Sequence, residues 1–120
     1  MKSRNEIMDI INQATATECY HRFSSIPGFP VITDGVLALA EAAGCFWWLD
    51  IIGSYQHDKR LCREFQVWKL GVDLETQTAV VRGCNDTDVI VEQVIPWTDF
   101  PLESCKVYLA EGVMLLPGEW

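Results

Sequence analysis

The chain has 120 residues, of which 49% are hydrophobic, and this length and composition fit a single domain over residues 1–120. Nine Lys and Arg residues against 17 Asp and Glu residues give a net charge of -8. A charge of that sign repels phosphate backbones and anionic lipid, so it argues against direct nucleic-acid binding and favours a protein partner with a basic surface.

The first ten residues, MKSRNEIMDI, lack the apolar core of a secretory signal, and the longest apolar run is too short to cross a bilayer. We therefore expect a cytoplasmic protein with no membrane partner. Five widely spaced cysteines favour apolar filler over a disulfide framework or a paired zinc motif. They are Cys19, Cys45, Cys62, Cys84 and Cys105.

The first predicted element is a helix over about residues 4–14. Ser3 and Glu6 have the spacing of a capping box, and apolar residues then recur at helical spacing. Residues 15–32 are expected to form an irregular connector, because Pro27 and Pro30 cannot hold a helix.

A second helix is predicted from about residue 34 to 56. Thr33 and Asp34 supply an N-cap, and an apolar stripe runs through GVLALAEAA. Gly44 either ends this helix or allows close packing within it. We expect one long or bent helix, with a further turn through residues 59–65 as an extension.

After residue 65 the pattern changes to period two, which predicts strands. The first begins after Phe65, and further strands are expected at 78–84, 88–95, 106–110 and 113–116. Turn residues between them predict sequential antiparallel hairpins. The predicted fold class is α+β, with two to three N-terminal helices packed on one face of a mostly antiparallel meander of four to five strands.

Three polar residues, Asp50, Ser54 and His57, share one face of the second predicted helix. A row on one helix face lacks the geometry of a hydrolytic triad, so we predict no catalytic residue there. The alternative function is a small metal- or thiol-dependent enzyme that uses His21, His57 and a cysteine. No motif places the three or four ligands that zinc needs, so neither a metal ligand nor a cofactor is predicted.

Acidic residues gather in the second half of the chain, where residues 61–120 hold 4 basic and 10 acidic side chains. The simpler interpretation is ordinary solvated turns. The functional interpretation is an acidic rim that steers the protein toward a basic groove. The residues predicted to bind a partner are Asp73, Glu75, Asp86 and Asp88 for the rim, and Trp97 with Phe46 or Trp47 as apolar anchors.

The five tryptophans divide into two groups. Trp48 and Trp68 lie on predicted core faces. Trp47, Trp97 and Trp120 have no obvious buried position, so they either pack in a second layer or mark a surface for self-association or for a partner. A structural homo-oligomer is therefore a third hypothesis.

Several segments resemble a family of bacterial and phage proteins that is catalogued as a domain of unknown function. They are Thr17-Glu18 with Tyr20-His21-Arg22, TDGVLALAEAAGCFWWLDIIGSYQ (33–56), FQVWKL (65–70), IPWTDFPL (95–102) and LAEGVMLLPGEW (109–120). The connector IPGFP departs from the family pattern. The resemblance implies no activity, cofactor or catalytic residue, but it implies a setting on phages and other mobile elements.

Charge and setting together predict a non-enzymatic acidic protein-binding module in the cytoplasm of a bacterial host. An inhibitor of a host defence complex, such as an anti-CRISPR or anti-restriction factor, fits both features. Its carboxylates would occupy a basic surface that normally holds nucleic-acid phosphate.

Overall fold

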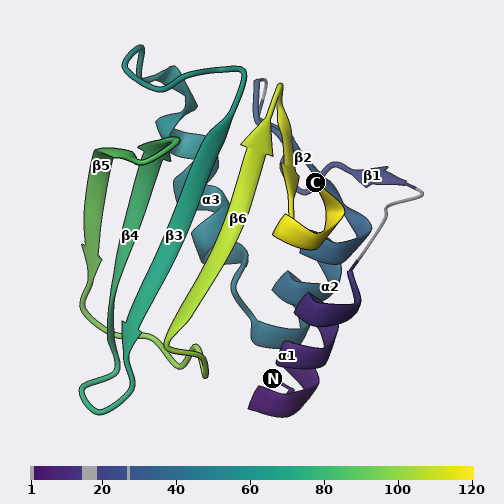
Figure 1. Ribbon diagram of the computed structural model, residues 1–120, viewed down its shortest axis with the longest axis vertical. Helices are drawn as coiled ribbons and strands as arrows, with labels where there is room; N and C mark the ends of the chain where they lie inside the picture. The colour runs from purple at the N-terminus through teal and green to yellow at the C-terminus, as the bar shows by residue number, and fades with distance from the viewer. Residues whose placement is uncertain (1, 15–18, 27) are drawn as a thin grey trace.

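The computed structural model describes residues 2–14, 19–26 and 28–120, so Thr17, Glu18 and Pro27 lie outside the described residues. Within the described ranges the chain has the predicted α+β fold, with three α-helices and one mixed sheet of seven strands (Figure 1). The helices are α1 (Arg4–Gln13), α2 (Asp34–Ala43) and α3 (Phe46–Ser54), with the 3₁₀ turns η1 (Tyr55–His57) and η2 (Pro117–Glu119). The strands are β1 (Tyr20–His21), β2 (Val31–Thr33), β3 (Gln66–Asp73), β4 (Thr78–Asn85), β5 (Asp88–Ile95), β6 (Ser104–Ala110) and β7 (Val113–Leu115).

Helix α1 begins at the Ser3 cap that the sequence predicts. Ser3 Oγ accepts a hydrogen bond from the Glu6 amide at 3.3 Å and donates one to Glu6 Oε1 at 3.0 Å. Ile7 is fully buried, and α1 packs against α2 and η2. Throughout the described ranges, no helix has the length and apolar character that crossing a membrane requires.

Of the two outcomes that the sequence allows at Gly44, the structure shows a helix end, so residues 34–56 form two helices instead of one long or bent helix. Gly44 ends α2 with a left-handed φ of 63°, and its amide donates to the Ala40 carbonyl. A residue without a Cβ adopts this conformation at low cost, which is why glycine so often ends helices. Helix α3 then begins at Phe46, and the predicted extension through residues 59–65 is not helical.

The sheet has the strand order β1-β2-β7-β6-β3-β4-β5. The hairpins β3–β4, β4–β5 and β6–β7 are antiparallel, as predicted. The simple meander is wrong at one step, because β6 pairs with β3 instead of β5. The connection between β5 and β6 passes the end of the β3–β4 hairpin, where the Thr98 amide donates to the Gln77 carbonyl at 2.8 Å.

The prediction of four to five strands is also wrong, because β1 and β2 lie in the connector that we expected to be irregular. They have two and three residues, which is too short for a period-two pattern to appear. Strand β2 pairs in parallel with β7, so it is held by a partner far along the chain.

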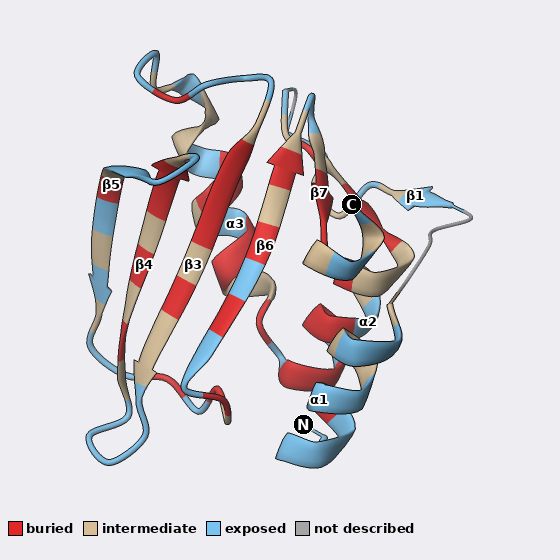
Figure 2. Cartoon of the chain, in the orientation of Figure 1, coloured by how far each residue is buried: buried red, intermediate tan, exposed pale blue. Residues whose placement is uncertain are grey.

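Helix α3 and β3 enclose much of the core. Trp48 and Trp68 are fully buried, as predicted, and the rings of Tyr55 and Trp68 are 5.9 Å apart between centroids. Figure 2 shows buried residues alternating with more exposed ones along β3 and β6. On the face of the sheet turned toward the viewer in Figure 1, no α-helix among the described residues lies over β3, β4 or β5, and we call it the open face. The η2 turn lies on the same side, next to β6, where the Trp120 ring is 6.3 Å from the Tyr108 ring between centroids.

Candidate functional site

The four carboxylates of the predicted rim lie at opposite ends of β4. Asp73 pairs in register with Thr78, where β4 begins, and Asp88 pairs with Asn85, where β4 ends. Eight residues of strand separate the two ends by about 24 Å at roughly 3.4 Å per residue. The acidic turns therefore do not form one continuous patch.

The first of these ends is the β3–β4 turn. The Asp73 carboxylate accepts a hydrogen bond from the Glu75 amide at 3.0 Å, so this carboxylate stabilises the turn. The carboxylate of Glu75 lies in an exposed part of the turn. Leu74, between them, is 40% exposed although it is apolar.

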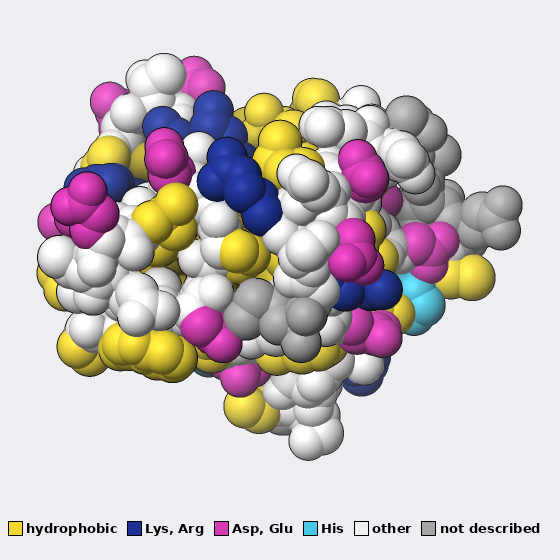
Figure 3. All heavy atoms as spheres, turned by 90° about the horizontal axis from the view of Figure 1, so that it is seen from below, with side chains coloured by type: hydrophobic (Ala, Val, Ile, Leu, Met, Phe, Trp, Pro, Cys, Tyr) yellow, Lys and Arg dark blue, Asp and Glu magenta, His cyan; other side chains and the backbone are white. Residues whose placement is uncertain are grey.

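Trp97 lies beside this turn. The bond from the Thr98 amide to the Gln77 carbonyl holds the segment after β5 against the turn, and the Trp97 side chain is 61% exposed. We define the hairpin end as Asp73, Leu74, Glu75 and Trp97. Figure 3 views the molecule from this lower side and shows hydrophobic and acidic side chains interspersed on the surface. One predicted acidic pair and one predicted anchor are thus brought together.

The other end is the β4–β5 turn. Asp86 adopts a left-handed φ of 58°, which a short polar side chain tolerates better than most, and Asp88 is exposed. The Asn85 side chain accepts from the Cys62 amide at 2.7 Å and donates to the Arg60 carbonyl at 2.8 Å. The Asn85 side chain therefore holds the loop that precedes β3 against the β4–β5 turn.

The remaining predicted anchors, Phe46 and Trp47, lie in the first turn of α3. Both are half-buried and pack against the core. Gly53, farther along this helix, is covered by Phe29, whose Cε2 would lie 2.5 Å from a Cβ at that position.

His21 and His57, the two histidines of the hypothesis of a metal- or thiol-dependent enzyme, have different surroundings. Nε2 of His21 lies 2.6 Å from Oδ1 of Asp34, at the first residue of α2, whereas His57 is exposed in η1. In the part of the chain that the structure describes, no three His, Cys, Asp or Glu side chains converge as metal ligands.

The cysteines differ in burial. Cys45, Cys84 and Cys105 are buried, whereas Cys19 and Cys62 are exposed. Burial raises the pKa of Cys45 to about 12, and it raises the pKa of Cys105 to about 12 as well. These two thiols are therefore not ionised near neutral pH and are unsuited to act as nucleophiles.

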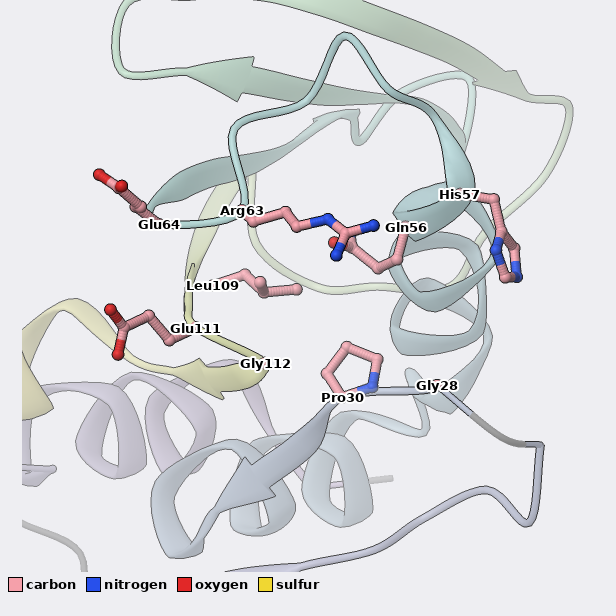
Figure 4. Close-up of a pocket in the computed structure, with 9 residues that line it drawn as sticks. All are labelled: Gly28, Pro30, Gln56, His57, Arg63, Glu64, Leu109, Glu111 and Gly112. Atoms are coloured by element: carbon pink, nitrogen blue, oxygen red, sulfur yellow. The ribbon is translucent and has the colours of Figure 1, made fainter.

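A cavity of about 580 Å³ lies between the β6–β7 turn, η1 and the connector before β2 (Figure 4). Its lining residues are Gly28, Pro30, Gln56, His57, Arg63, Glu64, Leu109, Glu111 and Gly112. The Arg63 side chain reaches across it toward Gln56, with His57 beyond, and the carboxylates of Glu64 and Glu111 lie on the opposite side.

Hydrogen bonds connect this cavity to the core. Gln56 Nε2 donates to Gln66 Oε1 at 3.0 Å, and the same oxygen accepts from Trp68 Nε1 at 2.8 Å. The Glu111 amide donates to the Arg63 carbonyl at 3.2 Å. The wall of the cavity is therefore anchored to a buried residue of β3.

Charged side chains of both signs line this cavity, among them Arg63, Glu64 and Glu111. Sequence reasoning missed the site because its lining comes from separate segments with no local motif. Only His57 had been singled out, as a residue of the enzyme alternative.

The family comparison covers nearly the whole chain. The model of a family of unknown function, DUF6876, matches residues 5–120, so an uncharacterised family is found as the resemblance predicted. No curated protein and no solved structure matches the chain.

Proposed function

Since the chain belongs to DUF6876, a family of unknown function, we propose its function from geometry and charge. We propose that it is a non-enzymatic, acidic protein-binding module. In this proposal the hairpin end docks on a basic surface of a partner protein, while the chain makes no direct contact with nucleic acid.

The observation that carries the proposal is the exposure of Trp97 beside two carboxylates. Its side chain is 61% exposed at the end of the sheet that also holds Asp73 and Glu75. Tryptophan is enriched at the energetic centres of protein interfaces, because it buries a large rigid surface on binding. Nearby carboxylates accelerate encounter with a basic partner and set its orientation.

We propose the class of partner from the charge of the chain and from the mobile-element setting that its resemblance to bacterial and phage proteins implies. We propose a host defence complex in the bacterial cytoplasm, so that the chain acts as an anti-CRISPR or anti-restriction inhibitor. The surface that it occupies is one that normally binds nucleic-acid phosphate. This proposal assumes that the helices cover one face of the sheet. The ends of the strands are then accessible to a partner protein.

The other predicted residues have smaller roles in this proposal. Asp86 and Asp88, about 24 Å away along β4, add long-range attraction without contacting the same site. Phe46 and Trp47 are half-buried, so each offers less apolar surface than Trp97.

Affinity capture from a bacterial lysate tests the proposal. The bait is the whole chain, compared with a Trp97→Ala, Glu75→Lys variant and with an Asp88→Lys control at the opposite end. A specific protein should bind the chain and the control, and the double variant should lose it. Added DNA should compete with the chain for the captured partner.

Two results would contradict the proposal. One is full retention of the partner by the double variant, and the other is a captured protein whose binding DNA does not affect. Self-association through Trp97 and Trp120 is the competing hypothesis, and sedimentation at several concentrations distinguishes it. The exposed positions of Glu75 and Trp97 should leave the melting temperature of the variant close to that of the parent.

A further inference from the structure

The open face carries a row of charged residues across four neighbouring strands. Lys69 on β3 pairs in register with Lys106 on β6 and with Arg82 on β4, and Arg82 pairs with Glu92 on β5. Because side chains alternate along a strand, Lys69 points away from the core that its neighbour Trp68 enters. We call Lys106, Lys69 and Arg82 the cationic row.

The cationic row is only partly neutralised by the protein itself. Arg82 Nε donates to Glu92 Oε2 at 2.8 Å. Among the described residues, no ion pair forms with Lys69 or Lys106, although these two ammonium groups stand on directly opposed residues. Like charges in that position destabilise a sheet, so the fold gains nothing from this arrangement.

Gly71 extends the same surface toward the β3–β4 turn. It lies two residues after Lys69 on the same face of β3, and a Cβ there would lie 3.9 Å from Arg82 Nη1. The guanidinium of Arg82 therefore lies in van der Waals contact with the position that a side chain at Gly71 would occupy.

An aromatic group lies next to the cationic row. Tyr108 follows Lys106 by two residues, so both point to the open face. The Phe65 ring is 5.2 Å from the Tyr108 ring and 4.9 Å from the Trp120 ring, between centroids. Trp120 is nevertheless 70% exposed. Figure 3 shows Lys and Arg side chains gathered beside hydrophobic ones in the upper part of the view.

Carboxylates surround this positive surface. Glu92 closes the row on β5, and the turns at the two ends of β4 carry Asp73 with Glu75 and Asp86 with Asp88. The row spans three strands, or about 10 Å at roughly 4.8 Å per strand. A long polyanion such as nucleic acid would run onto the carboxylates, whereas a short acidic segment fits between them.

We propose that the open face binds an acidic, extended polypeptide segment of a partner protein. Side chains on one side of an extended chain repeat every 7 Å or so, so two or three carboxylates can reach the cationic row. An apolar residue of the same segment packs on Trp120. This surface is separate from the hairpin end, so the chain has a second docking site of opposite charge.

Selection from a random dodecapeptide display library tests this proposal on the whole chain. The selected peptides should be enriched in Asp and Glu two or three residues apart, close to an apolar residue. The Lys69→Gln, Lys106→Gln variant should bind the best selected peptide about tenfold more weakly or worse. Rising NaCl should also weaken binding to the unmodified chain.

Matched controls separate this site from the hairpin end. The Trp97→Ala, Glu75→Lys variant should bind the selected peptide as well as the unmodified chain does. The Lys69→Gln, Lys106→Gln variant should melt at or above the parent temperature, because the substitutions remove a repulsion. A pool of random single-stranded oligonucleotides is selected in parallel.

The proposal is overturned if the selected peptides show no acidic enrichment, or if the variant and the unmodified chain bind them equally. Stronger selection of oligonucleotides than of peptides would overturn it as well, and would point to a single-stranded nucleic acid on the row and its aromatic neighbours.

Discussion

The two flanks of the sheet are built in different ways. The hairpin flank, β3–β4–β5, joins strands that follow one another in the chain through tight turns. The composite flank, β1–β2–β7, joins short strands, and its β2–β7 pair links Val31 to Val113 in parallel. The first flank is encoded by local pattern, whereas the second depends on contacts between distant segments.

A single carboxylate connects the composite flank to α2. Glu119 Oε1 accepts from Thr33 Oγ1 at 2.7 Å and from the Leu116 amide at 3.0 Å, and Oε2 accepts from the Gly35 amide at 3.3 Å. A Cβ at Gly35 would lie 2.5 Å from Glu119 Oε1, so the glycine makes room for the carboxylate. An anion at this position also interacts favourably with the helix dipole.

The largest expected effect is on the hairpin flank. Trp68→Ala should lower the free energy of unfolding by about 3–5 kcal/mol, because it removes a fully buried side chain and leaves a cavity. Urea denaturation measures the loss, and Trp120→Ala is the exposed control, with an expected loss below about 1 kcal/mol. Equal losses for the two variants would contradict the assignment of Trp68 to the core.

Glu119→Ala should have a smaller and more local effect. We expect a loss of about 2 kcal/mol, because the buried Thr33 hydroxyl and the Gly35 amide lose a charged acceptor. Hydrogen exchange should increase in β1, β2 and the first turn of α2 more than in β3–β5. Uniform acceleration over the whole sheet would show that the two flanks are not independent.

Gly35→Ala provides the matched test of the same contact. The new methyl group should displace the Glu119 carboxylate and destabilise the chain. When Glu119 is already alanine, the same substitution should cost less. A double-mutant cycle without coupling would contradict the close approach of these two residues.

Thiol reactivity compares the buried sheet interior with the exposed connectors without changing the packing of the chain. Cys19 and Cys62 should react rapidly with a thiol reagent in the native state, whereas Cys84 on β4 and Cys105 on β6 should react only on unfolding. Because burial raises the pKa of Cys45 and Cys105 to about 12, each stays neutral in the folded chain while the unfolded chain ionises above pH 9. Stability should therefore fall with rising pH, by about 1.4 kcal/mol per unit for each thiol.

If the Cys105→Ser variant folds, its free energy of unfolding should fall less steeply with rising pH above pH 9 than that of the parent. Rapid modification of all five thiols in the native state would contradict the burial of the three interior ones.

The smallest expected effect concerns two buried tryptophans. Nε1 of Trp48 has no hydrogen-bond partner among the described residues, whereas Nε1 of Trp68 donates to Gln66. Trp48→Phe should therefore cost less than Trp68→Phe, by about 1 kcal/mol, because only the second removes a buried hydrogen bond to Gln66, which keeps its hydrogen bonds to Gln56. Denaturation midpoints of the two variants measure the difference.

Sequence reasoning located the hairpin flank well because its signals are local. The alternation around Trp68 and the turn residues near Asp73 and Asp86 lie within the elements that they specify. Strands β1 and β2 were missed because they pair with distant residues and have no pattern of their own. The break at Gly44 was left open, since a glycine at that position is compatible with either outcome.

The candidate sites also contain some features with local sequence signals and others that depend on contacts between distant segments. Trp97 and the turn carboxylates were identified from composition and spacing, but their grouping at one end required the path of the β5–β6 connection. The outward position of Lys69 follows from the alternation in β3. Its pairing with Lys106 depends on β6 returning beside β3, which no local signal predicts.

The position of Glu119 has a consequence for the order of events on the ribosome. The first turn of α2 is synthesised 84 residues before the carboxylate that the Gly35 amide donates to. At bacterial and eukaryotic elongation rates, that interval lasts about 4 to 17 s. The Gly35 amide therefore lacks this acceptor while the hairpin strands are made, so the contacts of Glu119 with Thr33 and Gly35 form only after nearly all of the 120 residues have been synthesised.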